Sequence, residues 1–320
     1  MKNFLLKLIL FFAIYLSIVG VCRLILPSQV GNEFLLKKLE DYQTKSSNVN
    51  TVFFGNSYIN RHINPLIFDS LTTIPTVSYN LATDATPFME RSFIMETFLK
   101  KHRPDRVIML VCPSADIREE NLNHLRTIYY HDLKRTNYGL SYRHDKPKQK
   151  FYHLISFVRN QLQLFSLKDL FTLQLTGESL PEVVQHQRGF FGYDQETGMV
   201  HNPGLVKNKI AFEKRLNQLK TKGPVEHFDL KEADHVMYQE CLRLKQVAAG
   251  LDVELYFLFL PGSPRYAQFD LDNTIYMGDT RDLAELYDFS NWYNKGHLNT
   301  KGAELFSIKA AEAFNRTIAL

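Results

Sequence analysis

Two short segments near opposite ends of this 320-residue chain carry residue types suited to acyl-transfer chemistry. Ser57 closely follows the apolar run Thr51–Phe54, and His297 stands in a polar loop just before a helix-like stretch that begins at Thr300. A serine hydroxyl is a weak nucleophile unless a base removes its proton, and imidazole is a suitable base near neutral pH. The two segments therefore supply the residue types of a nucleophile, Ser57, and of a base, His297.

The segment Gly55-Asn56-Ser57 and the stretch from His297 to Gly302 together resemble the SGNH/GDSL hydrolase superfamily. In that superfamily the serine follows the first strand in a G-x-S-type turn, and the histidine lies in a D-x-x-H motif before the last helix. The His-Leu-Asn-x-x-Gly ending is closer to a membrane-anchored cell-envelope branch, which includes the alginate O-acetylation proteins and the D-alanyl transfer protein of teichoic acid. The resemblance covers roughly residues 50–115 and 250–320. In the alternative, Ser57 caps a helix and His297 is a surface loop residue.

The chain departs from the family at the residue that orients the histidine. Where the family has an aspartate three residues before the histidine, this chain has Asn294, which has no charge to stabilise an imidazolium. In a serine-protease triad the change from aspartate to asparagine lowers the rate by about four orders of magnitude. Three explanations stay open: Asp288 supplies the carboxylate, the serine and histidine work with an amide or backbone orienter, or the protein is a non-catalytic member.

The resemblance also implies hydrogen-bond donors for the oxyanion of the acyl-transfer intermediate. The backbone N–H of Ser57 is one of them. The segment Tyr79–Asp84 resembles the second block of the family, with Asn80 inside it and with Ala82 where the family has a glycine. We expect Asn80 and Ala82 to lie at the oxyanion hole or in the pocket.

The third block of the family offers an asparagine after a strand, but here the strand is followed by Ser114 and Asp116. The oxyanion hole should therefore be weaker or rearranged, and these two residues either line the site or form an ordinary turn. Asn56 either shapes the turn before Ser57 or lines the pocket, with the turn role favoured. Arg61 and His62 either reach a polar substrate or, as we expect, lie on a solvated helix face.

The elements that must position these residues follow from the hydrophobic pattern. Near-continuous apolar strands alternate with amphipathic helices, which indicates a parallel sheet covered on both faces. The predicted fold is α/β, a flavodoxin-like three-layer sheet as in the SGNH superfamily, over residues 49–320. The expected strands are Thr51–Phe54, Thr76–Leu81, Arg106–Pro113 and Val253–Pro261, and the expected helices are Phe88–His102, Ala233–Ala249 and Thr300–Phe314.

Residues from about 117 to 230 do not fit this alternation and are predicted to be one large insertion. Because ligands of α/β sheets bind beyond the carboxyl ends of the strands, an insertion leaving the third strand would lie beside Ser57. We expect it to contribute to substrate recognition. The remaining histidines lack metal-ligand spacing, and the three cysteines form neither a disulfide framework nor a zinc motif, so no metal or other cofactor is predicted.

The N-terminal residues predict a membrane segment. The chain carries no charge from Leu8 to Cys22, and Phe4 to Leu26 is long enough to cross a bilayer if Lys7 and Arg23 extend toward its interfaces. A cleaved signal peptide is the alternative, but the cleavage pattern is poor. We expect residues 1–30 to anchor the protein in membrane lipid, residues 31–48 to form a juxtamembrane stalk, and the domain to lie outside the cytoplasmic membrane.

Composition and charge narrow the function. A net charge of +4 with no concentrated basic run does not indicate nucleic-acid binding. The resemblance implies an O-acyltransferase or esterase that acts on a cell-envelope polysaccharide through an acyl-serine, beside a multi-pass membrane O-acyltransferase as partner. The alternative is a non-catalytic SGNH-like envelope protein that binds glycan or such a membrane partner.

Overall fold

The computed structural model describes residues 2–25, 33–84, 86–111, 182–193, 208–221, 232–261 and 271–319, with a few single positions between 137 and 155. The chain divides into two compact units, one of residues 1–36 and 121–179 and the other of residues 37–120 and 180–320. The second unit contains the sheet and every predicted site residue that is described.

Five parallel strands form a single sheet in the order β2-β1-β3-β4-β5. This is the strand order of flavodoxin-like doubly wound sheets. The parallel α/β sheet expected from the sequence is therefore confirmed. The last strand was not expected, because three residues give too short an apolar run to be distinguished from a turn. The strands are β1 (Thr51–Phe54), β2 (Ser78–Asn80), β3 (Arg106–Val111), β4 (Glu254–Phe259) and β5 (Thr274–Tyr276).

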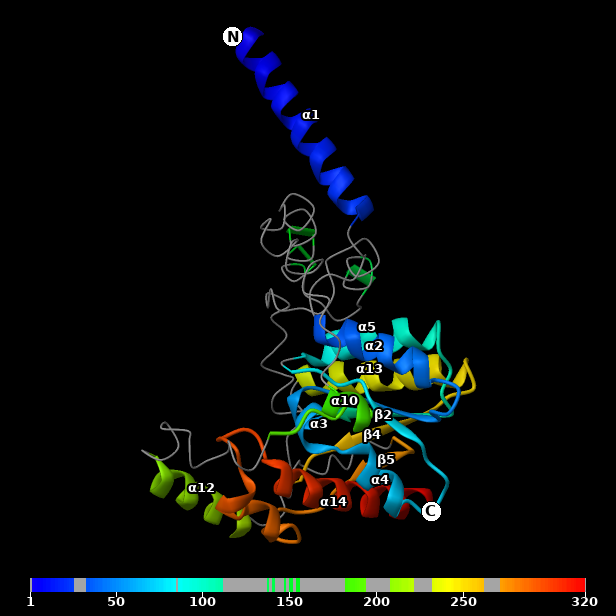
Figure 1. Ribbon diagram of the computed structural model, residues 1–320, viewed down its shortest axis with the longest axis vertical. Coiled ribbons are helices and arrows are strands. Elements are labelled where there is room, and N and C mark those ends of the chain that lie inside the picture. Colours follow the sequence, from blue (N-terminus) through cyan, green and yellow to red (C-terminus); the bar gives the residue numbers. More distant parts are fainter. Residues whose placement is uncertain are drawn as a thin grey trace. The chain divides into compact units, whose positions relative to one another are not determined.

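Helices cover both faces of the sheet. Figure 1 shows α5 (Phe88–Leu99) and α13 (Glu232–Ala249) over one face, and α4 (Pro65–Leu71) and α14 (Thr300–Ile318) over the other. Successive side chains of β1 point to opposite faces, as in any strand. The ring of Phe53 packs against Phe68 of α4 with centroids 5.0 Å apart, whereas Phe54 packs against Phe98 of α5 at 5.4 Å. The two apolar layers hold β1 between them, as a strand with neighbours on both sides in the sheet.

Helix α2 (Glu33–Lys45) is part of the sheet unit from residue 37 onward. Tyr42 is buried, and its ring lies 5.1 Å from that of Phe98. Lys38 is also buried, and its Nζ donates to the carbonyl oxygen of Ala82 at 2.7 Å. The expectation of a stalk over residues 31–48 is therefore wrong for this half of the helix, because its side chains pack into the domain.

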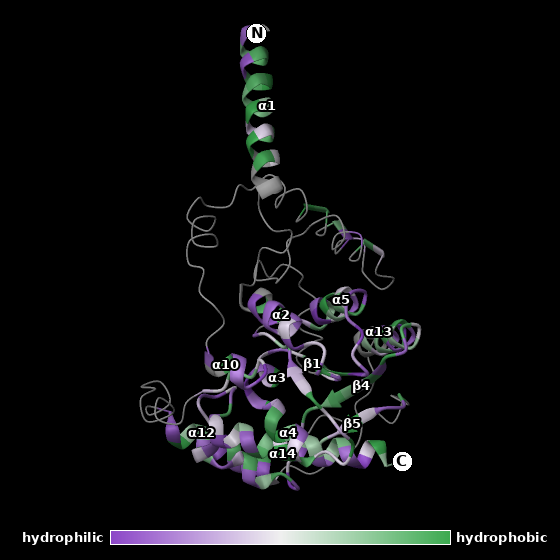
Figure 2. Cartoon of the chain, turned by 45° about the vertical axis from the view of Figure 1, so that its right-hand side comes forward, coloured by the Kyte–Doolittle hydropathy of each residue, from purple (hydrophilic) through white to green (hydrophobic). Residues whose placement is uncertain are grey.

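Helix α1 (Lys2–Ile25) runs without interruption. Its residues are mostly apolar, as the hydropathy colours in Figure 2 show, and its described apolar side chains are exposed. Among the residues that the structure describes, no helix combines the length and the hydropathy that a membrane crossing demands. The anchor over residues 1–30 stays a prediction, and residues 26–30 lie outside the described part of the chain.

The predicted insertion is described chiefly at α10 (Glu182–His186) with the residues up to 193, and at α12 (Lys209–Thr221). Both parts belong to the unit of the sheet. Gly189 has a φ of +85°, and a Cβ at this position would lie 2.3 Å from the carbonyl oxygen of Asn80. Glycine is needed for so close an approach in this backbone conformation. Residues 188–190 are thereby held against the carboxyl end of β2.

Candidate active site

The carboxyl end of β1 turns tightly into the short helix α3 (Ser57–His62). A Cβ on Gly55 would lie 2.3 Å from the Ile59 side chain, so the helix can pack this close only against glycine. Asn56 is the N-cap of α3, and its Oδ1 accepts the Tyr58 backbone N–H at 3.0 Å. The turn role favoured for Asn56 is confirmed. Ser57 is half-buried as the first residue of α3, and its Oγ makes no hydrogen bond to the described residues.

Asn294 orients His297. Its Oδ1 lies 3.0 Å from His297 Nδ1 and also accepts the backbone N–H groups of Gly296 at 2.8 Å and of His297 at 2.9 Å. Two backbone donors point at this atom, which identifies it as the oxygen of the amide. An amide oxygen only accepts, so the neutral ring carries its proton on Nδ1 and has its lone pair on Nε2. Of the three explanations for Asn294, this geometry matches an amide orienter.

Asp288 is held elsewhere. It is exposed and caps the short 3-10 helix η4 (Phe289–Asn291), where its Oδ1 accepts the Ser290 N–H at 2.9 Å and the Ser290 hydroxyl at 2.7 Å. These hydrogen bonds lower the pKa of the Asp288 carboxyl. The N–H at Nδ1 of His297 already donates a hydrogen bond to Asn294 Oδ1, so Asp288 cannot accept it. Asp288 as the substitute acid is therefore wrong.

The carboxylate that acts on His297 is Asp84, which the sequence did not single out. Asp84 accepts a hydrogen bond from Asn60 Nδ2 at 2.7 Å and forms an ion pair with Arg61. Burial lowers the pKa of His297 below its ordinary value of 6.5, the charge of Asp84 opposes that change, and the charge of Arg61 adds to it. The imidazole is consequently neutral at pH 7, which is the state that a general base needs.

Arg61 joins α3 to residues 191–193 of the predicted insertion. Its Nη1 donates to the carbonyl oxygen of Phe191 at 3.1 Å, and its Cζ lies 4.2 Å from the Phe191 ring centroid and 4.5 Å from that of Tyr193. The Tyr193 ring in turn stacks on Tyr293 at 3.8 Å. Only 8% of Arg61 is exposed, so the solvated position expected for it is wrong. The cation and the aromatic rings bring residues 191–193 to the site.

His62 is also buried, at 2% exposure, and the expectation of a solvated position is again wrong. Its Nε2 accepts the backbone N–H of Leu298 at 3.0 Å, which fastens the His297 loop to α3. Its Nδ1 has no hydrogen-bond partner among the described residues. Burial, with the charges of His297 and Arg61, lowers the pKa of His62 well below its ordinary value. The ring is therefore neutral, and because Nε2 accepts, Nδ1 carries the proton.

Asn80 and Ala82 hold the turn after β2 together. Asn80 Nδ2 donates to the carbonyl oxygens of Ile59 at 2.8 Å and Ile63 at 2.9 Å, and its Oδ1 accepts the Ala82 N–H at 3.0 Å. Both residues are buried, and the Ala82 N–H already has a partner. Neither group faces an oxyanion in this arrangement. The Ser57 N–H is the expected donor that remains, whereas Ser114 and Asp116 lie outside the described residues.

The His-Leu-Asn-x-x-Gly stretch has a structural role besides supplying His297. Leu298 is buried in the core, and Asn299 caps α14 by accepting the Gly302 N–H at 3.0 Å. A Cβ on Gly302 would lie 2.2 Å from the carbonyl oxygen of Asn291. The cap and the glycine fix the start of α14 against the loop, and the loop fixes His297.

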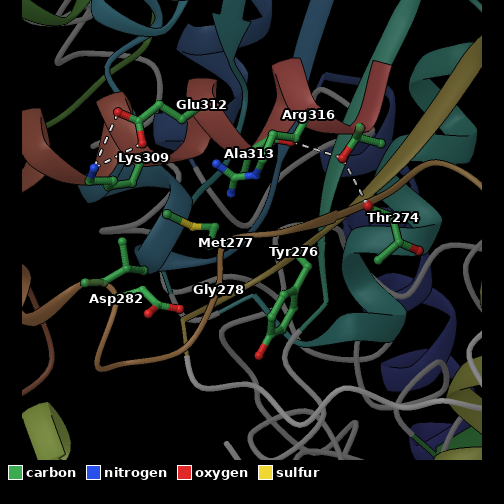
Figure 3. Close-up of a pocket in the computed structure, with 11 residues that line it drawn as sticks. Thr274, Tyr276, Met277, Gly278, Asp282, Lys309, Glu312, Ala313 and Arg316 are labelled. Carbon is green, nitrogen blue, oxygen red and sulfur yellow. Dashed lines mark hydrogen bonds and ion pairs between the residues drawn. The ribbon is translucent and has the colours of Figure 1, made fainter. Parts of the chain in front are cut away.

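Two hollows adjoin these elements. One, of about 210 Å³, is lined in part by Tyr58, which follows Ser57, and by Leu298, which follows His297. The other, of about 520 Å³, is a groove between β5 and α14 (Figure 3), where Lys309 and Glu312 form an ion pair at 3.0 Å. None of the residues predicted to do chemistry lines the second groove. In the described part of the chain, no group of His, Cys, Asp or Glu side chains is arranged to hold a metal ion.

The fold and the site define an α/β protein with a flavodoxin-like parallel sheet and a serine, a histidine and an asparagine at its carboxyl edge. Comparison with protein-family models, with curated proteins and with solved structures found no match to this chain.

Proposed function

We propose that the protein is an O-acyltransferase or esterase that works through an acyl-serine at Ser57. The observation that carries the proposal is the hydrogen bond of 3.0 Å between Asn294 Oδ1 and His297 Nδ1, which leaves Nε2 as the acceptor. The His297 ring lies 6.3 Å from the ring of Tyr58, the residue next to Ser57. A neutral imidazole close to the start of α3, the helix that begins at Ser57, supports the assignment of His297 as the base.

The proposed reaction begins when His297 Nε2 accepts the proton of Ser57 Oγ and Oγ bonds to the carbonyl carbon of an ester. The carbonyl electron pair moves to oxygen, where the Ser57 N–H can donate to the oxyanion. When this pair returns, the bond to the leaving alcohol breaks and the alcohol takes the proton from His297. Water or a sugar hydroxyl then repeats these steps on the acyl-serine.

Asp84 contributes to this mechanism through its charge. A carboxylate near the ring stabilises the imidazolium that forms when His297 accepts the proton, although the Arg61 guanidinium paired with Asp84 opposes part of this effect. The hydrogen bond between Ser57 Oγ and His297 would form when substrate binds, since catalytic hydrogen bonds are often long before that.

The identity of the substrate rests on the resemblance to the SGNH/GDSL cell-envelope branch. On that basis we propose a cell-envelope polysaccharide as acceptor, an extracytoplasmic location with membrane attachment through residues 1–30, and a multi-pass membrane O-acyltransferase as partner. The exposed apolar side chains of α1 support attachment to lipid. Replacing Leu10 and Ile14 by arginine should release the protein from the membrane fraction, and a wild-type protein found only in the soluble fraction would contradict the attachment.

Labelling with a fluorophosphonate, which reacts with activated serines, tests the chemistry. The wild-type protein and a Ser70→Ala control, changed at an exposed serine of α4, should both be labelled. Ser57→Ala should lose the label, and His297→Ala should slow labelling strongly. Label retained by Ser57→Ala would refute Ser57 as the nucleophile.

A non-catalytic envelope protein that binds glycan or a membrane partner is the second candidate. The uncharged orienter Asn294 favours it, because an amide stabilises an imidazolium less than a carboxylate does. This candidate requires that no variant turns over an ester and that envelope function survives Ser57→Ala. Loss of polymer acylation in a Ser57→Ala strain with normal protein level would exclude it.

A further inference from the structure

The 210 Å³ cavity beside the site is lined mainly by apolar side chains. It lies against α14 and α12, on the face of the sheet that Phe53 also covers. Two of its lining residues, Tyr58 and Leu298, are the immediate chain neighbours of Ser57 and His297. Its apolar lining includes Phe212, Leu216, Leu219, Leu286, Trp292 and Phe306.

One polar group in this lining stands out. His62 borders the cavity, is almost completely buried, and carries its proton on Nδ1, which has no partner among the described residues. The two cationic side chains of the lining, Arg215 and Lys295, belong to exposed residues and so mark the side that opens to solvent. A buried N–H donor in apolar surroundings favours a ligand that brings an acceptor oxygen with it.

We propose that this cavity binds the acyl chain of the substrate, with an acyl carbonyl oxygen accepting the hydrogen bond of His62 Nδ1. This inference rests on the proposed acyl-serine chemistry. The acyl donors of that reaction would be esters of medium-length, apolar acyl groups. Because Tyr58, the residue after Ser57, lines this cavity, it is the apolar site available to an acyl chain carried by Ser57. A volume of about 210 Å³ holds about seven groups of the size of a water molecule, at roughly 30 Å³ each. The matching acyl group has about six to eight carbons.

A series of p-nitrophenyl esters from two to twelve carbons tests the size of the site. We expect kcat/KM to rise by up to about fourfold for each methylene that is buried, and to stop rising near eight carbons. Leu219→Phe, which fills the cavity, should move the optimum to shorter chains. Asn217→Phe is the matched control on the exposed face of the same helix and should leave the series unchanged. A series without chain-length preference, or a Leu219→Phe protein with an unchanged optimum, would overturn the proposal.

A binding measurement separates this inference from the proposed function. Trp292 lines the cavity and is the only tryptophan of the chain, so its fluorescence reports binding even in the Ser57→Ala protein, which cannot turn over. We expect methyl octanoate to bind about three- to tenfold more tightly than octane, the difference that one hydrogen bond makes. Absence of any binding would overturn the inference even if Ser57-dependent hydrolysis is found. Binding without hydrolysis by the wild-type protein would overturn the proposed function instead.

Two substitutions at His62 separate its two nitrogens. The glutamine oxygen in His62→Gln can still accept from Leu298 N–H but offers no donor at the Nδ1 position, so the preference for ester over octane should disappear. The asparagine of His62→Asn places an N–H donor near the Nδ1 position and should keep the preference. Equal preference in both variants would rule out the hydrogen bond from His62 Nδ1.

Discussion

The replacement Asn294→Asp tests the central feature of the site. An aspartate keeps the oxygen that accepts from His297 Nδ1 at 3.0 Å and from two backbone N–H groups, and it adds a negative charge. The charge stabilises the imidazolium that forms in the transition state, which an amide cannot do. We therefore expect the substitution to raise kcat/KM for a small ester.

The magnitude follows from the geometry. Unit charges about 4 Å apart interact by about 4 kcal/mol at an effective dielectric constant of about 20, which limits the gain to roughly a thousandfold. Two effects reduce it: the new carboxylate loses solvation in a half-buried loop, and Asp84 already supplies negative charge to the ring. An increase of about ten- to a hundredfold is the expected result.

The pH profile gives an independent measurement. In the wild-type protein, burial lowers the pKa of His297, so kcat/KM should be nearly constant around neutral pH and fall only below it. A carboxylate beside Nδ1 favours the protonated ring and raises this pKa, so the acid limb of Asn294→Asp should move to higher pH. Asp288→Asn, at an exposed cap, should change neither rate nor profile. If Asn294→Asp leaves both quantities unchanged, Asn294 does not orient the catalytic ring.

Three further predictions concern the framework. Gly302→Ala should lower the free energy of unfolding in urea by about 1–3 kcal/mol, because the new Cβ would meet a backbone oxygen at 2.2 Å. Gly250→Ala is the control: its Cβ would have no neighbour closer than 3.4 Å, so it should lower that free energy by less than about 1 kcal/mol. Arg61→Gln should lower the unfolding free energy by roughly 2 kcal/mol and increase proteolysis at residues 191–193, since Asp84 and two aromatic rings lose their cation. The free energy of unfolding should decrease as pH falls below about 6.5, because His62 takes up a proton in the unfolded chain but not in the folded protein. In His62→Gln this dependence on pH should be weaker. An equal dependence in both proteins would contradict the prediction.

The sequence alone was sufficient to predict four of the five strands of the sheet. The strands β1, β3 and β4 are buried on both faces, so each appears in the sequence as a nearly continuous apolar run, which is typical of a buried parallel strand. Their observed bounds differ from the expected ones by at most a few residues. The Gly55-Asn56-Ser57 turn was also recognisable, because a close helix needs a glycine and a helix start needs a capping side chain. Both requirements concern residues that are close together in the chain, so the sequence is sufficient to recognise them.

The neighbours of His297 could not be obtained in that way. The sequence does not distinguish Asp288 from Asp84, because both are aspartates in polar loops. In the structure the loop after β2 packs against α3 and brings Asp84 near the His297 ring, whereas Asp288 caps its own turn. Arg61 and His62 follow a nucleophile turn on a short helix and suggest a solvated face, yet residues 191–193 and the His297 loop cover them. The chain determined which side chains are able to do chemistry. Contacts between separate segments of the chain, from about 20 to more than 200 residues apart, determined which of them share a site, because burial and charge depend on what packs against a residue and not on what precedes it.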